Sequence, residues 1–216
     1  GEIKVETTKE EFCQKHNLDF SKPIIALLPG SRHKEIVRIL PLMLETANVM
    51  SKQNNDLQFV VAMASNRKLN EFEQAKNKIG DLPNKLTVVK NETWEALKAA
   101  DAAAVTSGTA TLETGIIGTP MAIVYKTSAL NYKLLRPLID VPHFGLINLI
   151  AQERLAKELI QDDFTAETLA AELFRLLETD TNKRFRQRLN QVNETLGHGG
   201  TAKRAAQSIF KLLQNS

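Results

Sequence analysis

Short apolar runs alternate with amphipathic segments of helical period as far as Lys126, and this alternation limits the fold more than any other feature. The runs lack strict alternation of apolar and polar side chains, as expected of strands buried on both faces of a parallel sheet. Repeated strand–helix units with short links predict an α/β fold with a doubly wound parallel sheet. The expected strands are 23–29, 57–63, 86–90, 101–106 and 120–126, and the expected helices between them are 34–53, 66–79, 91–99 and 109–117.

After Lys126 the helical pattern takes over, with Gly197–Gly200 as a break. We therefore expect a Rossmann-like domain over residues 1–180 and a helical C-terminal extension over 181–216. The expected helices of this part are 128–138, 151–160, 166–178, 181–196 and 201–214.

Two local details concern helix starts and interruptions. Thr8 and Glu11 have the spacing of a capping box. Pro41 falls inside the segment 34–53. It either kinks one helix or marks the start of a second piece after a short first turn.

Composition excludes several classes of protein. With 43% hydrophobic and 25% charged residues, the chain is globular rather than disordered or fibrous. A net charge of +3 without basic–aromatic interleaving argues against nucleic acid as a partner. The single cysteine, Cys13, excludes an internal disulfide and fits a reducing cytosol. No apolar stretch is long enough to span a membrane. The chain starts at Gly1 rather than Met, so we expect it to be either processed or truncated.

The first candidate site is the turn in LLPGSRHKEI, residues 27–36. Gly30 permits close backbone approach, Ser31 can cap a helix, and Arg32 offers a planar fork suited to phosphate. The pattern is neither a Walker loop nor GxGxxG. A structural turn with a solvated arginine is the alternative.

The second candidate is VTSGTATLETG, residues 105–115. Ser107, Gly108 and Thr109 follow a strand and open a helix, where free amides and the helix dipole favour a phosphate. Glu113 lies one turn further and could reach a ribose diol. Alternatively, Ser107 or Thr109 is a simple N-cap and Glu113 balances the dipole.

The third candidate is Asn148 in GLINLIAQE, residues 145–153, which we expect just before a helix. A lone amide among aliphatic residues is either a satisfied core or capping asparagine or is aimed at a ligand.

The remaining polar residues indicate neither a metal nor a cofactor. The histidines lack metal-ligand spacing, and no aspartate cluster suits Mg²⁺. Ser107 is not in a G-x-S-x-G elbow, so hydrolase chemistry is poorly supported. The segment 128–139 is either a packed helix with snorkelling basic residues or a contact for lipid or acyl chains. The four histidines are His16, His33, His143 and His198.

Taken together, LLPGSRHKEI, SGTATLE, GTPMAIVYK and NLIAQERLAKELIQDDFT in this order resemble the C-terminal half of the lipid-A-disaccharide synthase family. The resemblance runs from about Pro23 to the last helix. It implies the donor-binding half of a GT-B glycosyltransferase. Such an enzyme joins UDP-2,3-diacylglucosamine to 2,3-diacylglucosamine 1-phosphate with inversion, releasing UDP. The N-terminal half would supply the lipid acceptor site and the general base.

The resemblance also assigns roles. It makes Arg32 the catalytic residue that stabilises the leaving diphosphate, and Asn148 a residue near the nucleotide. Ser107, Gly108 and Thr109 would cradle the diphosphate, and Glu113 would hold the ribose. The amides and the guanidinium would oppose the developing charge without a metal.

The chain departs from the family's usual pattern at two positions close to Asn148. It has Ile147 where proline is common and Gln152 where glycine is common.

Two other classes of function remain open. One is a related UDP-sugar enzyme, such as a UDP-N-acetylglucosamine 2-epimerase or the lipid II-forming transferase of peptidoglycan synthesis. The other is a non-catalytic nucleotide-binding module. The lipid substrates imply a cytoplasmic protein with peripheral contact at the inner face of the membrane, and the sequence is compatible with an oligomer. We further expect the last helix, 201–214, to pack on the N-terminal half.

Overall fold

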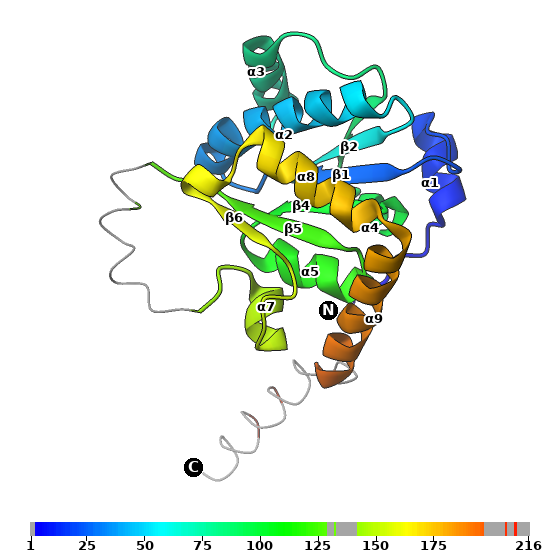
Figure 1. The fold of residues 1–216 in the computed structure, drawn as a ribbon, viewed down its shortest axis with the longest axis vertical. Coiled ribbons are helices and arrows are strands. Elements are labelled where there is room, and N and C mark those ends of the chain that lie inside the picture. The colour runs from blue at the N-terminus through cyan, green and yellow to red at the C-terminus, as the bar shows by residue number, and fades with distance from the viewer. Residues whose placement is uncertain (1–2, 129–131, 133–141, 197–205, 207–209, 211–216) are drawn as a thin grey trace.

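The computed structural model describes residues 3–128, 132, 142–196, 206 and 210, and these contain one six-stranded sheet (Figure 1). Every neighbouring pair of strands is parallel, and the order is β3-β2-β1-β4-β5-β6. The predicted doubly wound sheet is therefore confirmed, with its topological switch point between β1 and β4. The strands are β1 (Ile24–Leu28), β2 (Gln58–Met63), β3 (Leu86–Lys90), β4 (Ala102–Thr106), β5 (Met121–Tyr125) and β6 (Glu158–Ile160).

Helices cover both faces of the sheet (Figure 1). On one face α2 packs against α8 and α3, and on the other α4 crosses β1 to β3 while α5 lies on β4. A short 3₁₀ turn, Gln161–Asp163, follows β6. The helices are α1 (Lys9–His16), α2 (His33–Gln53), α3 (Leu69–Ile79), α4 (Thr93–Ala99), α5 (Thr109–Ile117), α7 (Leu146–Ala151), α8 (Ala166–Leu177) and α9 (Thr179–Thr195).

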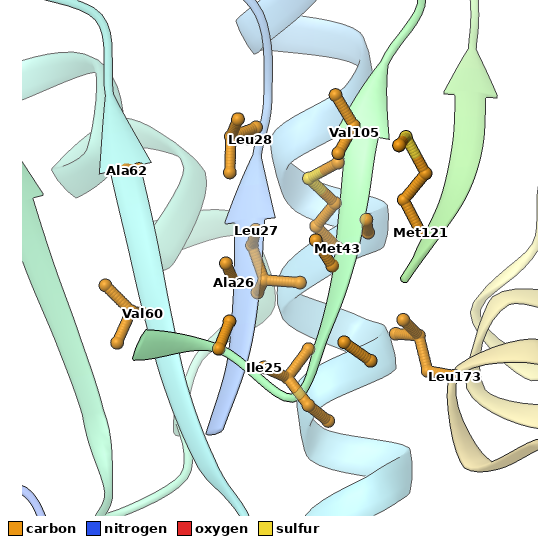
Figure 2. Packing of buried hydrophobic residues seen from close by; sticks show 14 of the residues in the cluster. Ile25, Ala26, Leu27, Leu28, Met43, Val60, Ala62, Val105, Met121 and Leu173 are labelled. Carbon is orange, nitrogen blue, oxygen red and sulfur yellow. The ribbon is translucent and has the colours of Figure 1, made fainter. Parts of the chain in front are cut away.

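The core lies on both sides of the central strands. All residues of β1, β2 and β4 are buried, as the unbroken apolar runs predict. Figure 2 shows Met43 of α2 and Leu173 of α8 in one cluster with side chains of the sheet. Close packing of this kind holds the carboxyl ends of the strands in fixed positions.

The prediction of a helix over 151–160 is wrong. Helix α7 ends at Ala151, and Gln152 adopts a left-handed conformation with φ 55°. The chain then forms β6, whose Glu158 pairs with Ile123 of β5. The helical spacing of apolar residues in this segment was misleading, because the backbone groups of β5 need partners at the sheet edge.

The other elements for which a range was predicted agree with it apart from residues at their ends, namely β1 to β5, α2 to α5, α8 and α9. Helix α7 was not predicted. Thr8 and Glu11 form the expected capping box at the start of α1, with bonds of 3.1 and 2.8 Å. Pro41 lies inside the continuous helix α2, so a separate second helix is excluded. Within the described ranges, no helix is long and apolar enough to cross a membrane.

Several predictions lie outside the described residues. One is the helix 128–138, most of which is not described, together with the alternative that this segment contacts lipid or acyl chains. The others are the break at Gly197–Gly200 and the helix 201–214, nearly all of which is not described, with its packing on the N-terminal half.

Helix α9 packs on α8 and α5. Arg186 of α9 donates to the carbonyls of Gly118 and Ala100 at 2.9 and 3.1 Å, and these residues are the C-caps of α5 and α4. Its guanidinium therefore interacts favourably with two helix C-termini, although burial lowers the pKa of Arg186. The division into domains 1–180 and 181–216 stays a prediction.

Candidate functional site

A buried hydrogen bond joins the carboxyl ends of the two strands at the switch point. Leu28 of β1 pairs with Val105 of β4, and Thr106 Oγ1 donates to the carbonyl of Leu28 at 2.9 Å. The segments 30–32 and 107–109 follow directly. Two of the candidate segments are thus brought together where open α/β sheets bind their ligands.

Glu35 organises the turn at Gly30. Its Oε2 accepts the backbone N–H groups of Ser31 and Arg32, both at 3.1 Å, and its Oε1 accepts Arg32 Nη1 at 2.6 Å. Gly30 has φ 104°, and a Cβ there would lie 2.5 Å from Glu35 Oε2. This position therefore needs glycine for its backbone conformation and for the space that the carboxylate occupies.

The group of this turn that is available to a ligand is the side chain of Arg32, not the backbone amides. The amides of Ser31 and Arg32 already bind a carboxylate, whereas the side chain of Arg32 is 79% exposed. The hydrogen bond that Arg32 donates to Glu35 raises the pKa of Arg32 further, so the guanidinium stays charged. Sequence reasoning gave no role to Glu35, although its N3 spacing from Arg32 was a usable signal.

The N-terminus of α5 is arranged differently. Its N-cap is Gly108, with φ 148° and no side-chain cap, so the alternative of a Ser107 or Thr109 cap is wrong. In the part of the chain that the structure describes, the amides of Gly108, Thr109 and Ala110 donate no hydrogen bond. Gly108 and Thr109 are exposed, so these donors are accessible to an anion.

Ser107 anchors the chain that leads into α7. Its hydroxyl donates to the carbonyl of Phe144 at 2.6 Å, and the amide of Leu146 donates to Thr111 Oγ1 at 3.1 Å. The third candidate segment therefore lies beside the start of α5.

Asn148 lies inside α7, not before a helix as predicted, and is fully buried. Its Nδ2 donates to Ala156 O at 2.8 Å and to Glu158 Oε1 at 2.9 Å, and its Oδ1 accepts Ala156 N at 2.8 Å. Glu158 Oε1 also accepts the amides of Phe144 and Gly145. This is the satisfied core asparagine of the structural alternative, and a nucleotide contact of Asn148 stays a prediction.

Ile147 packs over Gly115 of α5. A Cβ on Gly115 would lie 2.5 Å from Ile147 Cδ1. The isoleucine that stands here in place of the common proline therefore fits because residue 115 is a glycine.

Glu113 accepts a hydrogen bond of 2.7 Å from Trp94 Nε1 at its Oε2. Its Oε1 has no partner among the described residues. The carboxylate is partly exposed one turn from Thr109, so it can accept a ligand hydroxyl beside a bound phosphate. Sequence reasoning missed Trp94, although it is the single tryptophan and follows a predicted strand.

The site thus combines a charged guanidinium, a helix N-terminus and a carboxylate acceptor. These groups can hold a phosphate linked to a hydroxylated group. Across the described ranges, no group of three or more His, Cys, Asp or Glu side chains could hold a metal ion.

A doubly wound parallel sheet with such a site at its switch point defines a Rossmann-like domain, and similar solved structures include GT-B glycosyltransferases. WaaG, a glycosyltransferase involved in lipopolysaccharide biosynthesis, is similar with a TM-score of 0.66 and 16% identity, covering 95% of this chain and 52% of WaaG. The glycosyltransferase VinC, in complex with DTDP, has a TM-score of 0.51 and 21% identity, covering 82% and 40%. These likenesses show the fold, the Rossmann-like half of the GT-B architecture.

Residues 1–212 match the family described as lipid-A-disaccharide synthetase, and the chain belongs to this family. The lipid-A-disaccharide synthases of Trichlorobacter lovleyi and Syntrophus aciditrophicus are both 38% identical over 99% of the chain. The chain covers 55% and 56% of these relatives, about half of their length. The resemblance inferred from the four motifs is therefore confirmed.

Proposed function

We propose that this chain is the donor-binding half of an inverting glycosyltransferase that forms lipid A disaccharide 1-phosphate. The donor is UDP-2,3-diacylglucosamine, the acceptor is 2,3-diacylglucosamine 1-phosphate, and UDP leaves. The observation that carries the proposal is the uncapped N-terminus of α5 at the switch point, where α5 follows β4 and the turn with Arg32 follows the paired strand β1. Membership of the family favours this activity over the epimerase, the lipid II-forming transferase and a non-catalytic module.

The diphosphate binds the amides of Gly108 and Thr109, next to Ser107, while Glu113 accepts from the ribose. Glycosidic bond cleavage places negative charge on the leaving UDP. The fixed amides and the guanidinium of Arg32 stabilise this charge without having to reorganise. Gly30 and Ser31 contribute to the donor site indirectly, because they form the turn that positions Arg32.

Asn148 contributes through the segment that it holds. Its bonds to Ala156 and Glu158 fix the α7 turn beside Ser107, so the wall of the nucleotide site keeps its shape. Asn148 thus belongs to the proposed UDP-sugar site as a residue near the nucleotide that shapes this wall.

The other half of the full-length protein supplies the lipid acceptor site and the general base. Because both substrates carry acyl chains, the enzyme works in the cytoplasm against the inner face of the membrane as a peripheral protein.

Calorimetric titration of the chain with UDP, UMP and uridine tests the donor site. We expect the affinity to rise with each phosphate. Arg32→Ala should weaken UDP binding by about tenfold to a hundredfold and leave uridine binding unchanged, because a charge-assisted hydrogen bond contributes about 1.5–3 kcal/mol. Equal UDP affinity in Arg32→Ala would remove Arg32 from the proposed site.

Arg38→Ala is the matched control. Arg38 lies on the same helix and donates to the carbonyl of Lys34, so its loss removes the same charge away from the turn. We expect its UDP affinity to equal that of the parent chain. In the full-length enzyme, acylated UDP-glucosamine should be preferred over the unacylated sugar, and the opposite preference would favour a related UDP-sugar enzyme.

A further inference from the structure

The hydrogen bond between Trp94 and Glu113 links two helices at the edge of the site. Trp94 is the second residue of α4, Glu113 lies in the second turn of α5, and the two helices pack together. Both side chains are partly exposed, so this bond of 2.7 Å borders solvent. Helix α4 follows β3 and α5 follows β4, so both helices start on the carboxyl side of the sheet, where the site lies.

The indole nitrogen can only donate a hydrogen bond. It therefore engages one oxygen of Glu113 and restricts rotation of the carboxylate. Oε1, which has no partner in the described part of the chain, is left as the acceptor for a ligand hydroxyl. A carboxylate held in this way loses less side-chain freedom when a ligand binds.

We infer that Trp94 is a positioning residue that makes the site select ribonucleotides over deoxyribonucleotides, acting through Glu113. The inference rests on the proposed function, since it takes the ribose of the donor to lie at Glu113. Without the indole N–H, the carboxylate would sample more orientations and would accept less well from a ribose hydroxyl.

The test measures the affinities of the chain for UDP, 2′-deoxy-UDP and 3′-deoxy-UDP by calorimetry. We expect UDP to bind at least about tenfold more tightly than the deoxy analogue that lacks the hydroxyl bound by Glu113. This is the difference expected for a hydrogen bond to a charged group. In Trp94→Phe this preference should fall by about threefold to tenfold, through weaker UDP binding alone. Equal losses for UDP and that analogue would overturn the inference, because they would indicate a general structural effect.

Two further variants separate positioning from folding. In a Glu113→Ala background, Trp94→Phe should not change the ribose preference further, because the intermediate residue is missing. An additive effect would contradict the inference. Glu95→Gln, which changes the next residue of α4, is the matched control and should keep the parent preference. Thermal unfolding of each variant confirms that it is folded.

Tryptophan fluorescence gives an independent readout, because Trp94 is the only tryptophan. Uridine should change its emission at saturation, whereas inorganic diphosphate should not. An equal change with diphosphate would place the phosphates at Glu113 and overturn the inference. If the parent chain binds no UDP, the proposed function fails and the inference fails with it. If it binds UDP and Trp94→Phe keeps the full ribose preference, the inference alone fails.

Discussion

Glu35 Oε1 accepts a hydrogen bond of 2.6 Å from Arg32 Nη1, and its other oxygen binds the amides of Ser31 and Arg32. Helix α2 therefore carries its own anion at its N-terminus, whereas the first amides of α5 have no partner among the described residues. Two neighbouring helix starts thus have different roles. The start of α2 presents a guanidinium, and the start of α5 presents backbone donors.

Glu35→Ala should destabilise the chain by about 2 kcal/mol, because it removes the buried carboxylate that accepts two partly buried amides and the guanidinium of Arg32. Urea unfolding measures the effect. Glu11→Ala is the matched control, since Glu11 has the same N3 position in α1 but is exposed. Its loss should cost about 0.5–1 kcal/mol. Equal costs for the two variants would contradict the role of Glu35.

Gly30→Ala should destabilise the chain more than Gly80→Ala. Both glycines have positive φ, 104° and 85°, so both substitutions introduce backbone strain of about 1–3 kcal/mol. A Cβ at Gly30 would also collide with Glu35, while nothing lies within 4 Å of a Cβ at Gly80. Adding Glu35→Ala to Gly30→Ala should remove most of this excess, because the carboxylate goes and only the Cβ of residue 35, at 3.0 Å, remains close. Chemical denaturation of these three variants and of Glu35→Ala gives the comparison, and equal midpoints for the two single glycine variants would argue against the collision.

Asn148→Asp should be more destabilising near neutral pH than Asn148→Ala. The substitution replaces a donor with a carboxylate oxygen beside Glu158 Oε1 and Ala156 O, which lie 2.9 and 2.8 Å from the present nitrogen. Repulsion and burial would raise the pKa of the new carboxyl. Its charged form, and hence the penalty, dominates above that raised pKa, so the two variants should converge in unfolding temperature as pH falls. A constant difference between pH 8 and pH 5 would be inconsistent with this explanation.

Glu71 should make the chain sensitive to acid. Its hydrogen bond to His33 Nδ1, 2.7 Å long, holds the pKa of Glu71 below its usual value of about 4.3. A depressed folded pKa contributes stability that is present above the unfolded pKa and is lost as pH falls through the folded pKa. Urea midpoints between pH 7 and pH 3 should therefore fall more steeply in the parent chain than in Glu71→Gln.

Glu73→Gln is the control for this acid sensitivity. Glu73 is an exposed residue of the same helix with no hydrogen bond in the described part of the chain. Its pH profile should match that of the parent chain. A parallel profile for Glu71→Gln as well would show that the His33 contact does not contribute.

Much of the fold could be predicted because its signals are local. Each central strand is an unbroken apolar run, and the sheet buries both sides of it. Thr8 and Glu11 cap α1 through a spacing that depends on their own helix alone. The strand β6 was missed because its conformation depends on pairing with β5, and this partner lies more than thirty residues earlier in the chain.

The sequence by itself determined the strand–helix alternation, the glycine turns at Gly30 and Gly108 and the family, because these depend on residue types at short spacings. The tertiary structure decided which partner each polar group has. Asn148 of α7 donates hydrogen bonds to Ala156 and Glu158, and Trp94 of α4 donates one to Glu113 of α5. A hydrogen bond forms only between groups that the fold brings within about 3 Å, and no local pattern records which distant groups those are.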